Sequence, residues 1–269
     1  MKPEKAMTRA KELLDAADLQ GAIDCVTSEV KANPLDMQRR TLLFELLCFA
    51  GEFDRAERQL EVIGSQSAQS QIGVQVYRNN IEAERRRKKL FADGLEPHFL
   101  IPPPAYVDLL MSATNRVREG NTKEARALLD RVEEESPARR GLFNGRQFQH
   151  LRDWNDFTSP VLELFVRSDY AWLPFEQIRR IEISAPRHLR DLMWTPARIE
   201  ARDGTIGEVY IPALYANSDQ HANDLVRLGR MTDWKSLDED LFIPQGLRVF
   251  MVDDEYKSLL EARSIEFVE

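Results

Sequence analysis

Apolar and small residues recur at helical spacing through the first half of the chain. The first stripe predicts a helix from about residue 5 to 16 and consists of Ala6, Ala10, Leu13, Leu14 and Ala17. Asp18 and Gly21 interrupt this pattern, and a second stripe begins at Ala22. The second helix is predicted to end at Asn33, because Pro34 disfavours helical geometry in the residue before it. Together the two stripes predict a helical hairpin.

The spacing of this hairpin returns further along the chain. Ala22 and Val26 correspond to Ala56 and Leu60, a shift of 34 residues (56 − 22 = 34). A third stretch has the same internal spacing at Ala125, Leu129 and Pro137. The pattern resembles the tetratricopeptide repeat, a helix-turn-helix unit whose small residues let two helices approach closely. The aromatic residue and the glycine of that repeat's first helix are missing, so the resemblance implies a degenerate array.

One long helix is predicted between the second and third units. It covers the stretch "QIGVQVYRNNIEAERRRKKLFADG" and ends at Gly94, before the prolines at 102–104. Its basic run at 85–89 allows two interpretations. The first is a solvated face of a long helix, which the neighbouring acids Glu82 and Glu84 favour. The second is a patch for nucleic acid or for an acidic partner.

After about residue 150 the pattern changes to short β-rich runs with aromatic and turn residues. "VLELFV" and "YAWLPF" predict two strands, and residues 196–215 predict a hairpin that turns at "RDGT". A further pair of strands is predicted from "GLRVFMV" and "RSIEFVE". Helical pieces are predicted in "FEQIRRI", "HLRDLMW" and "DQHANDLVRLG".

These patterns predict an α+β protein with two domains. Residues 1–148 are expected to form an all-α, tetratricopeptide-like array of helix pairs. Residues 149–269 are expected to form a β-rich α+β domain with a mostly antiparallel sheet.

Composition narrows the classes of function. The formal net charge of −8 argues against a general nucleic-acid binder, since phosphate contacts need a surplus of Lys and Arg. Cys25 and Cys48 lie in apolar helical patterns and are expected to be reduced core residues. No run of signal-peptide type begins the chain, and no segment has the ~20 apolar residues of a membrane span, so the cytoplasm is the expected location.

The repeat resemblance also implies a binding surface. First helices of such units line a concave face that usually holds a peptide or helix of a partner. The positions that would face into this groove are Lys11, Leu14, Glu45, Cys48, Thr114 and Val117. The alternative is that the apolar members pack against the long helix or the second domain.

Five stretches of the second half resemble a known family. They are "WNDFTSPVLELF", "YAWLPFEQI", "RDLMWTPARIEARDG", "RLGRMTDW" and "GLRVFMVDDE". Their order and spacing are similar to the ImpE/TagJ family, also labelled SciE-type, of accessory proteins in bacterial type VI secretion. The resemblance implies a non-enzymatic cytoplasmic adaptor without a cofactor. It also implies binding of a helix near the amino terminus of the sheath small subunit, and a link to the sheath-disassembling AAA+ ATPase.

Two of these stretches share a polar and aromatic cluster. Its members are Arg190, Asp191, Trp194, Arg227, Arg230, Asp233 and Trp234. Arg and Trp are residues that interfaces use as anchors. The alternative is an internal network in which arginines pair with carboxylates and both indoles fill the core.

An enzyme and an oligomerising scaffold are the competing hypotheses. A hydrolase-like site would use the carboxylates Asp153 and Asp156 with Arg190, or the acids of "VDDE" at 252–255. Structural roles compete with both: "DWND" can cap a turn, and "VDDE" is interpreted as a junction between a strand and a helix. The four histidines lack metal-binding spacing, so no metal is expected; they are His98, His150, His188 and His221.

Overall fold

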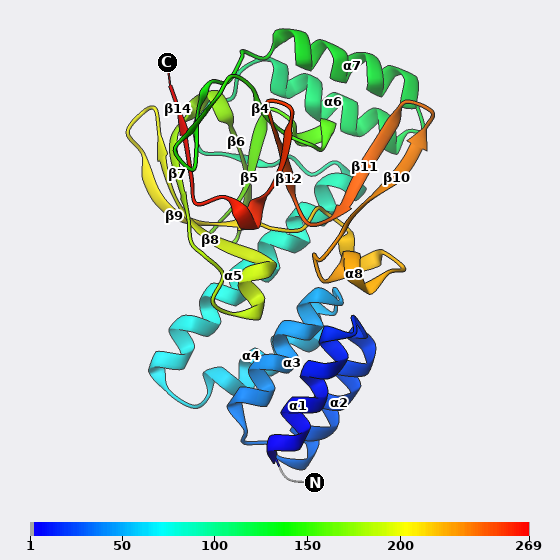
Figure 1. Ribbon diagram of the computed structural model, residues 1–269, viewed down its shortest axis with the longest axis vertical. Coiled ribbons are helices and arrows are strands. Elements are labelled where there is room, and N and C mark those ends of the chain that lie inside the picture. Colours follow the sequence, from blue (N-terminus) through cyan, green and yellow to red (C-terminus); the bar gives the residue numbers. More distant parts are fainter. Residues whose placement is uncertain (1–2, 269) are drawn as a thin grey trace.

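The computed structural model describes residues 3–268, which form a helical part, residues 3–135, and a sheet part, residues 141–268 (Figure 1). The helices of the helical part are α1 (Pro3–Asp15), α2 (Leu19–Ala32), α3 (Met37–Phe49), α4 (Phe53–Gly64), α5 (Ala68–Asp93), α6 (Tyr106–Arg118) and α7 (Thr122–Glu135). A short helix of the sheet part is α8 (Asp224–Arg227).

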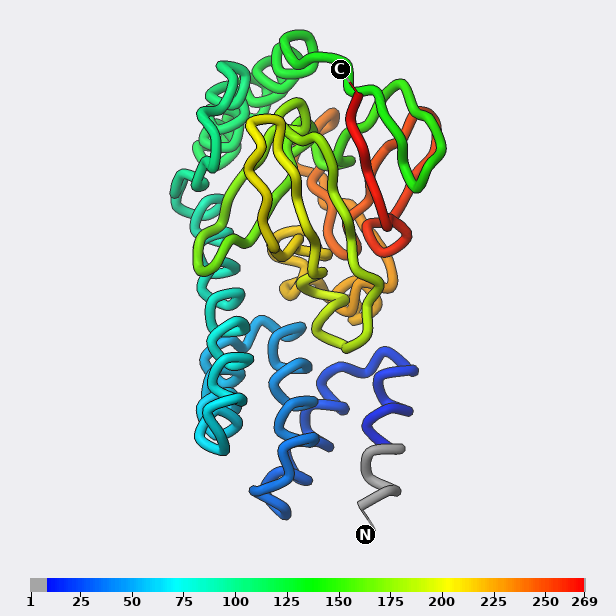
Figure 2. Tube along the Cα trace, turned by 90° about the vertical axis from the view of Figure 1, so that its left-hand side faces the viewer, coloured from blue at the N-terminus to red at the C-terminus, as the bar shows by residue number. Residues whose placement is uncertain are grey.

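The predicted helix pairs are confirmed as α1–α2, α3–α4 and α6–α7. Side chains cap the start of the second helix in two of these pairs: Asp18 accepts a hydrogen bond from the Gly21 N–H, and Asn121 accepts one from the Glu124 N–H. Ala22 has no exposed surface, as close helix contact requires. The long helix α5 ends at Gly94, whose φ of +75° forms a left-handed cap. It carries the chain away from α1–α4, so α6 and α7 lie at the opposite end of the molecule (Figure 2).

The strands form one large sheet and two small ones. Their bounds are β1 (His98–Phe99), β2 (Gly141–Phe143), β3 (Arg146–Phe148), β4 (Leu151–Asp153), β5 (Val161–Val166), β6 (Asp169–Pro174), β7 (Ile178–Ile183), β8 (Trp194–Ala201), β9 (Ile206–Pro212), β10 (Thr232–Asp238), β11 (Leu241–Gly246), β12 (Val249–Val252), β13 (Glu255–Ser258) and β14 (Ser264–Phe267). Within residues 3–268 the large sheet has nine strands in the order β1-β6-β5-β9-β8-β7-β14-β2-β3. The small sheets are β10-β11 and β13-β12-β4. The β1–β6 pair is parallel and the other strand pairs are antiparallel, which confirms the predicted α+β class.

Two predicted strand pairs are confirmed and one is wrong. β5 pairs with β6, and β8 pairs with β9. "GLRVFMV" and "RSIEFVE" do not pair: β12 lies between β4 and β13, and β14 lies between β7 and β2. The cause is a tight turn at Asp253, with φ +51°, which returns the chain at once into β13. The same turn shows that the helix expected after "VDDE" is wrong.

The predicted helical pieces of the sheet part are confirmed only as short turns. In "FEQIRRI" a 3₁₀ turn at Phe175–Gln177 leads into β7, whose isoleucines at 178, 181 and 183 are buried. A 3₁₀ turn at Leu189–Leu192 precedes β8, and the third stretch holds a turn at Ser218–Gln220 followed by α8. Each piece is too short to bury a helical face, so strand packing decides the backbone conformation.

The helical part and the sheet part share one hydrophobic core. A buried cluster runs from α2, α3 and α4 to Phe165, Trp172 and Trp194 of the sheet. A second cluster fills the space inside the sheet part and includes Phe175 and Phe250. Strands β1, β2 and β3 belong to the large sheet although they precede residue 149. The division at 148/149 stays a prediction.

Candidate interaction cleft between the two parts

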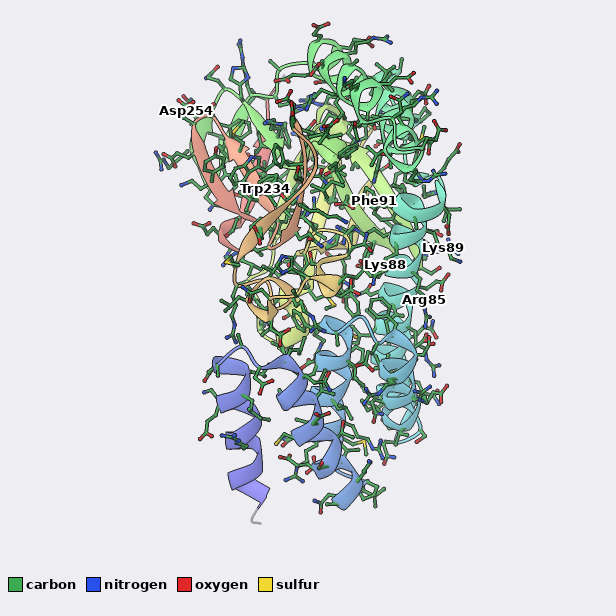
Figure 3. The ribbon with its side chains drawn as sticks, turned by 90° about the vertical axis from the view of Figure 1, so that its right-hand side faces the viewer. Arg85, Lys88, Lys89, Phe91, Trp234 and Asp254 are labelled. Carbon is green, nitrogen blue, oxygen red and sulfur yellow. The ribbon has the colours of Figure 1, made fainter. Side chains whose placement is uncertain are left out.

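The basic run of α5 joins the two parts of the molecule. Arg87 is 1% exposed, and its Nε donates to Glu163 Oε1 of β5 at 2.7 Å. Lys88 Nζ donates to Asp219 Oδ2 at 2.7 Å and stands 5.0 Å from the centre of the Phe53 ring. Figure 3 shows this side of α5. The predicted solvated face is therefore wrong for most of the run.

The flanking arginines of the run also have protein partners. Arg85 Nη2 donates to Asp54 at 2.6 Å and to Glu57 at 2.7 Å, which ties α5 to α4. Arg86 pairs with Asp169 at the start of β6. Because residues 85–88 already pair with carboxylates, the run offers little free positive charge to phosphates. The interpretation of the run as a nucleic-acid patch is therefore not supported either.

Glu163 and Arg248 form the centre of a buried ionic network. Arg248 is fully buried, pairs with both Glu163 and Asp153, and donates from Nε to the Pro212 carbonyl at 3.0 Å. Burial by itself raises the pKa of Glu163, but Arg248 and Arg87 outweigh it and lower this pKa to about 2. Burial raises the pKa of Asp153 to about 6, against the attraction of Arg248.

The carboxylates of the hydrolase hypothesis do not form one open site. Asp153 has no exposed surface. Asp156 accepts hydrogen bonds from Arg126 and Arg152, both at 2.8 Å. Arg190 contacts α3 and α5 instead. In the turn at "VDDE", Asp253 Oδ1 accepts two backbone N–H groups, from residues 149 and 150.

The residues of the family-signature cluster fall into two groups: one lies at the contact between the helical part and the sheet part, and the other lies near the surface. Arg190 Nη1 donates to Glu45 Oε1 and its Nε donates to the Tyr77 hydroxyl, both at 2.6 Å. Asp191 accepts backbone N–H groups of residues 187 and 188, and so caps the turn that carries Arg190. Trp194 is 1% exposed and packs in the shared core. These three residues follow the internal-network interpretation.

The remaining members lie nearer the surface. Arg227 donates to Asp224 at 2.8 Å, and Arg230 donates to the Asp15 carbonyl of α1 at 3.3 Å. Asp233 is exposed, with Oδ2 3.3 Å from His221 Nε2. Trp234 packs edge-on against Trp154, with 4.7 Å between ring centroids.

The six positions assigned to the repeat groove are distributed over both ends of the molecule. Thr114 and Val117 lie on α6, far from α1 and α3 (Figure 1). Thr114 is buried and its hydroxyl donates to the Leu110 carbonyl at 3.0 Å. Lys11 is exposed and Leu14 is half-buried. Glu45 and Cys48 are buried on α3.

The face of α3 that carries Glu45 opens into a cleft of about 590 Å³. Its lining from α3 is Met37, Gln38, Thr41, Leu42 and Glu45, and its lining from the sheet part is His188, Leu189 and Arg190. Glu45 and Arg190, one from each side of this lining, form an ion pair, and Cys48, one turn further along α3, is buried. Burial raises the pKa of Glu45, against the hydrogen bond from Arg190. The sequence analysis selected Glu45 and Arg190 for separate reasons. It gave no signal that these residues, 145 positions apart, lie in the same cleft.

None of the helices in residues 3–268 combines the length and the apolar character that a bilayer crossing needs. Over the same residues, His, Cys, Asp and Glu do not gather in threes where a metal ion could be held.

The fold defines a class of two-part proteins in which helix pairs are joined to an antiparallel sheet through buried ion pairs. The ImpE protein family model matches residues 145–266. The chain is 35% identical over 258 residues to the type VI secretion system accessory component TagJ of Pseudomonas aeruginosa, covering 96% of this chain and 90% of TagJ. This chain belongs to the ImpE/TagJ family.

A solved structure has the same fold. The crystal structure of the protein VPA1032 from Vibrio parahaemolyticus matches with a TM-score of 0.89 and 24% identity. The match covers 97% of this chain and 98% of that one, so the arrangement of both parts recurs as a unit.

Proposed function

We propose that this protein is a cytoplasmic, non-enzymatic accessory component of a type VI secretion system that binds a helix of the sheath small subunit. The cleft between α3 and residues 188–190 is the proposed site. The observation that carries the proposal is that one face of α3, from Met37 to Glu45, lines an open cleft, whereas the last turn of α3 is buried.

The chemistry of the cleft fits an amphipathic helix. Met37, Leu42 and Leu189 supply apolar contacts from both walls. A helix laid in a groove binds through side chains spaced three and four residues apart. The lining positions 38, 41, 42 and 45 of α3 have this spacing, and Leu42 is the apolar one among them. Arg190 and Glu45 place a paired cation and anion in the lining of the cleft, and such polar groups can fix the orientation of a bound helix.

Family membership supports the choice of partner. TagJ is named as a type VI secretion accessory component, and the sequence resemblance of both parts extends over nearly the whole chain. We extend the proposal to the AAA+ ATPase that disassembles contracted sheaths, as the second protein that this adaptor links to the sheath.

A calorimetric titration with matched leucine variants tests the proposal. The full chain is titrated with a synthetic peptide of the amino-terminal helix of the cognate sheath small subunit. Leu42→Arg, in the cleft, is expected to weaken binding at least about tenfold, because a charge replaces an apolar anchor. Leu35→Arg, at a position 81% exposed in the loop before α3, is the control and should leave affinity unchanged.

Circular dichroism establishes that both variants are folded. A folded Leu42→Arg protein that binds the peptide as tightly as the wild type would remove the cleft from the proposal. Absence of binding to the wild-type chain would remove the sheath helix itself.

A further inference from the structure

A second cleft lies between α7 and the three-stranded sheet β13-β12-β4. Its volume is about 770 Å³. Residues of α7 line one wall, and residues of β4 and β12 line the other; the ones used below are Arg126, Leu129, Glu133, Arg139, Arg152 and Met251. The β10–β11 hairpin stands beside it, with Asp238 accepting a hydrogen bond from Thr122 at the start of α7. This cleft is at the far end of the molecule from the cleft at α3 (Figure 1).

Aromatic side chains continue the floor of this cleft. Arg152, Met251 and Tyr256 are direct neighbours across the small sheet, so they share one face. Trp154 lies two residues beyond Arg152 and stacks on Tyr256, with 3.9 Å between ring centroids and 16° between planes. Trp234 of β10 packs edge-on against Trp154. We call Trp154, Trp234 and Tyr256 the aromatic trio.

The trio leaves one ring face open to solvent. Tyr256 uses one face against Trp154 and is 56% exposed, so its outer face is available. An aromatic face of this kind attracts a cation through its quadrupole, and an apolar side chain through contact area. Trp234 and Asp254 lie on the sheet part, away from the basic run of α5 (Figure 3).

Two of the three arginines that line this cleft have a carboxylate partner. Arg126 and Arg152 both bind Asp156, each at 2.8 Å. Arg139 donates to the Leu151 carbonyl at 3.4 Å. Its Nε and Nη2 are buried without a hydrogen-bond partner among the described residues, and burial lowers the pKa of Arg139.

Two carboxylates of the cleft remain available. Glu133 on α7 and Asp254 in the β12–β13 turn are exposed, and neither has a hydrogen-bond or ion-pair partner among the described side chains. Asp253 keeps one of its two oxygens free while the other accepts backbone N–H groups. Glu133, Asp253 and Asp254 outnumber Arg139, which is the arginine of the lining without a carboxylate partner among the described residues. The unpaired charge of the cleft is therefore net negative, and it complements a basic partner.

We infer that this cleft and the aromatic trio bind a segment of a partner protein in which an arginine or lysine stands beside apolar side chains. The cation of the partner lies over the outer face of Tyr256, near the exposed carboxylates of Glu133 and Asp254. The apolar neighbours contact Leu129 and Met251. This surface is independent of the sheath-helix site at α3 and gives the adaptor a second docking position.

A pair of matched peptides tests the inference on the full chain. The probe is an N-acetylated, C-amidated peptide of sequence Leu-Arg-Leu-Leu-Arg, and its control replaces both arginines by neutral, nearly isosteric citrulline. Binding is followed by the indole N–H resonances of the four tryptophans. Trp154 and Trp234 report on the surface, and the buried Trp172 and Trp194 serve as internal references.

The arginine peptide is expected to shift the indole signals of Trp154 and Trp234 alone. The citrulline peptide should bind about threefold to tenfold more weakly, since the cation–π contact and the exposed carboxylates each contribute modestly. Equal binding of the two peptides, or equal shifts of all four indoles, would overturn the inference. So would indole shifts that depend on protein concentration without peptide, because a second copy of the chain would then occupy the surface.

Variants of the two exposed carboxylates test this second cleft independently of the proposed sheath-helix site at α3. Glu133→Gln combined with Asp254→Asn should reduce the preference for the arginine peptide to near onefold. Glu134→Gln, one residue along α7 and outside the cleft lining, is the control and should preserve it. Leu42→Arg should leave pentapeptide binding unchanged, so a failure at one cleft is distinguishable from a failure at the other. An unchanged preference in the folded double variant would contradict the inference.

Discussion

Two of the arginine–carboxylate contacts that join the helical part to the sheet part differ in burial. Arg87 and Glu163 are 2% and 1% exposed and belong to a network that continues to Arg248 and Asp153. Arg190 and Glu45 are 18% and 8% exposed and form the wall of an open cleft. The buried pair therefore holds the two parts together, because breaking an ion pair that is shielded from water is far more costly than breaking an exposed one. The half-exposed pair instead forms part of a proposed binding surface.

Removing Arg248 is the strongest way to test this difference. Arg248→Met leaves Asp153 and Glu163 buried with one cation fewer, and we expect the free energy of unfolding to fall by about 3–5 kcal/mol. Urea unfolding followed by circular dichroism measures it. Arg55→Met, which removes an exposed pair with Glu52, is the control and should cost at most about 1 kcal/mol. A loss of similar size in both variants would show that burial does not determine how much these ion pairs contribute to stability.

The two carboxylates of the buried network should respond to pH in opposite directions. Glu163 has a pKa lowered from 4.5 to about 2, so its stabilising contribution is complete above pH 4.5 and is lost as pH falls toward 2. Asp153 has a pKa raised from 3.8 to about 6, so its contribution is complete below pH 3.8 and is lost as pH rises through 6. Each shift of about two pH units corresponds to about 3 kcal/mol.

Asp153→Asn isolates one side of this response. Relative to the wild type, the variant should gain stability as pH rises from 4 to 7, because the amide does not have to ionise. Glu163→Gln should instead lose relative stability as pH rises from 2 to 4.5. Urea unfolding at several pH values gives both curves, and parallel curves for the two variants would show that the network titrates differently.

The half-buried pair should contribute less than the buried network. Arg190→Met removes the hydrogen bonds to Glu45 and Tyr77, and we expect a loss of about 1–2 kcal/mol in unfolding free energy. Glu45 can then accept a proton, since burial already raises its pKa. The same variant should weaken sheath-peptide binding, because the cleft loses part of its wall. A loss as large as that of Arg248→Met would place this pair with the network instead.

The smallest effect is expected for an exposed ion pair of α5 that lies next to the buried Arg87. Arg86 is 41% exposed and pairs with Asp169, which is 42% exposed, whereas its neighbour Arg87 is buried. Arg86→Ala should change unfolding free energy by at most about 1 kcal/mol. Repeating the measurement in 1 M salt should erase even that difference through screening. A loss that does not depend on salt would contradict the description of Arg86–Asp169 as an exposed ion pair.

Local signals in the sequence determined most of the secondary structure. The helix pairs follow from apolar periodicity, from caps such as Asp18, and from Gly94, which only local backbone geometry requires. The β5–β6 and β8–β9 hairpins follow from alternation and a short turn, since the partner strand is the next one along the chain. Membership of the family was also evident from the order of short stretches in the second half.

Only the tertiary structure decided the non-local pairings. Alternation in β14 shows which face is buried but not that β7 and β2 are its neighbours, because many strands share the same period. In the same way, a run of five basic residues has the composition of a solvated face, yet Arg87 meets Glu163 across 76 residues of sequence. Periodicity and turn chemistry act over a few residues, whereas the partner of a buried charge or a strand edge is fixed by the packing of the whole chain.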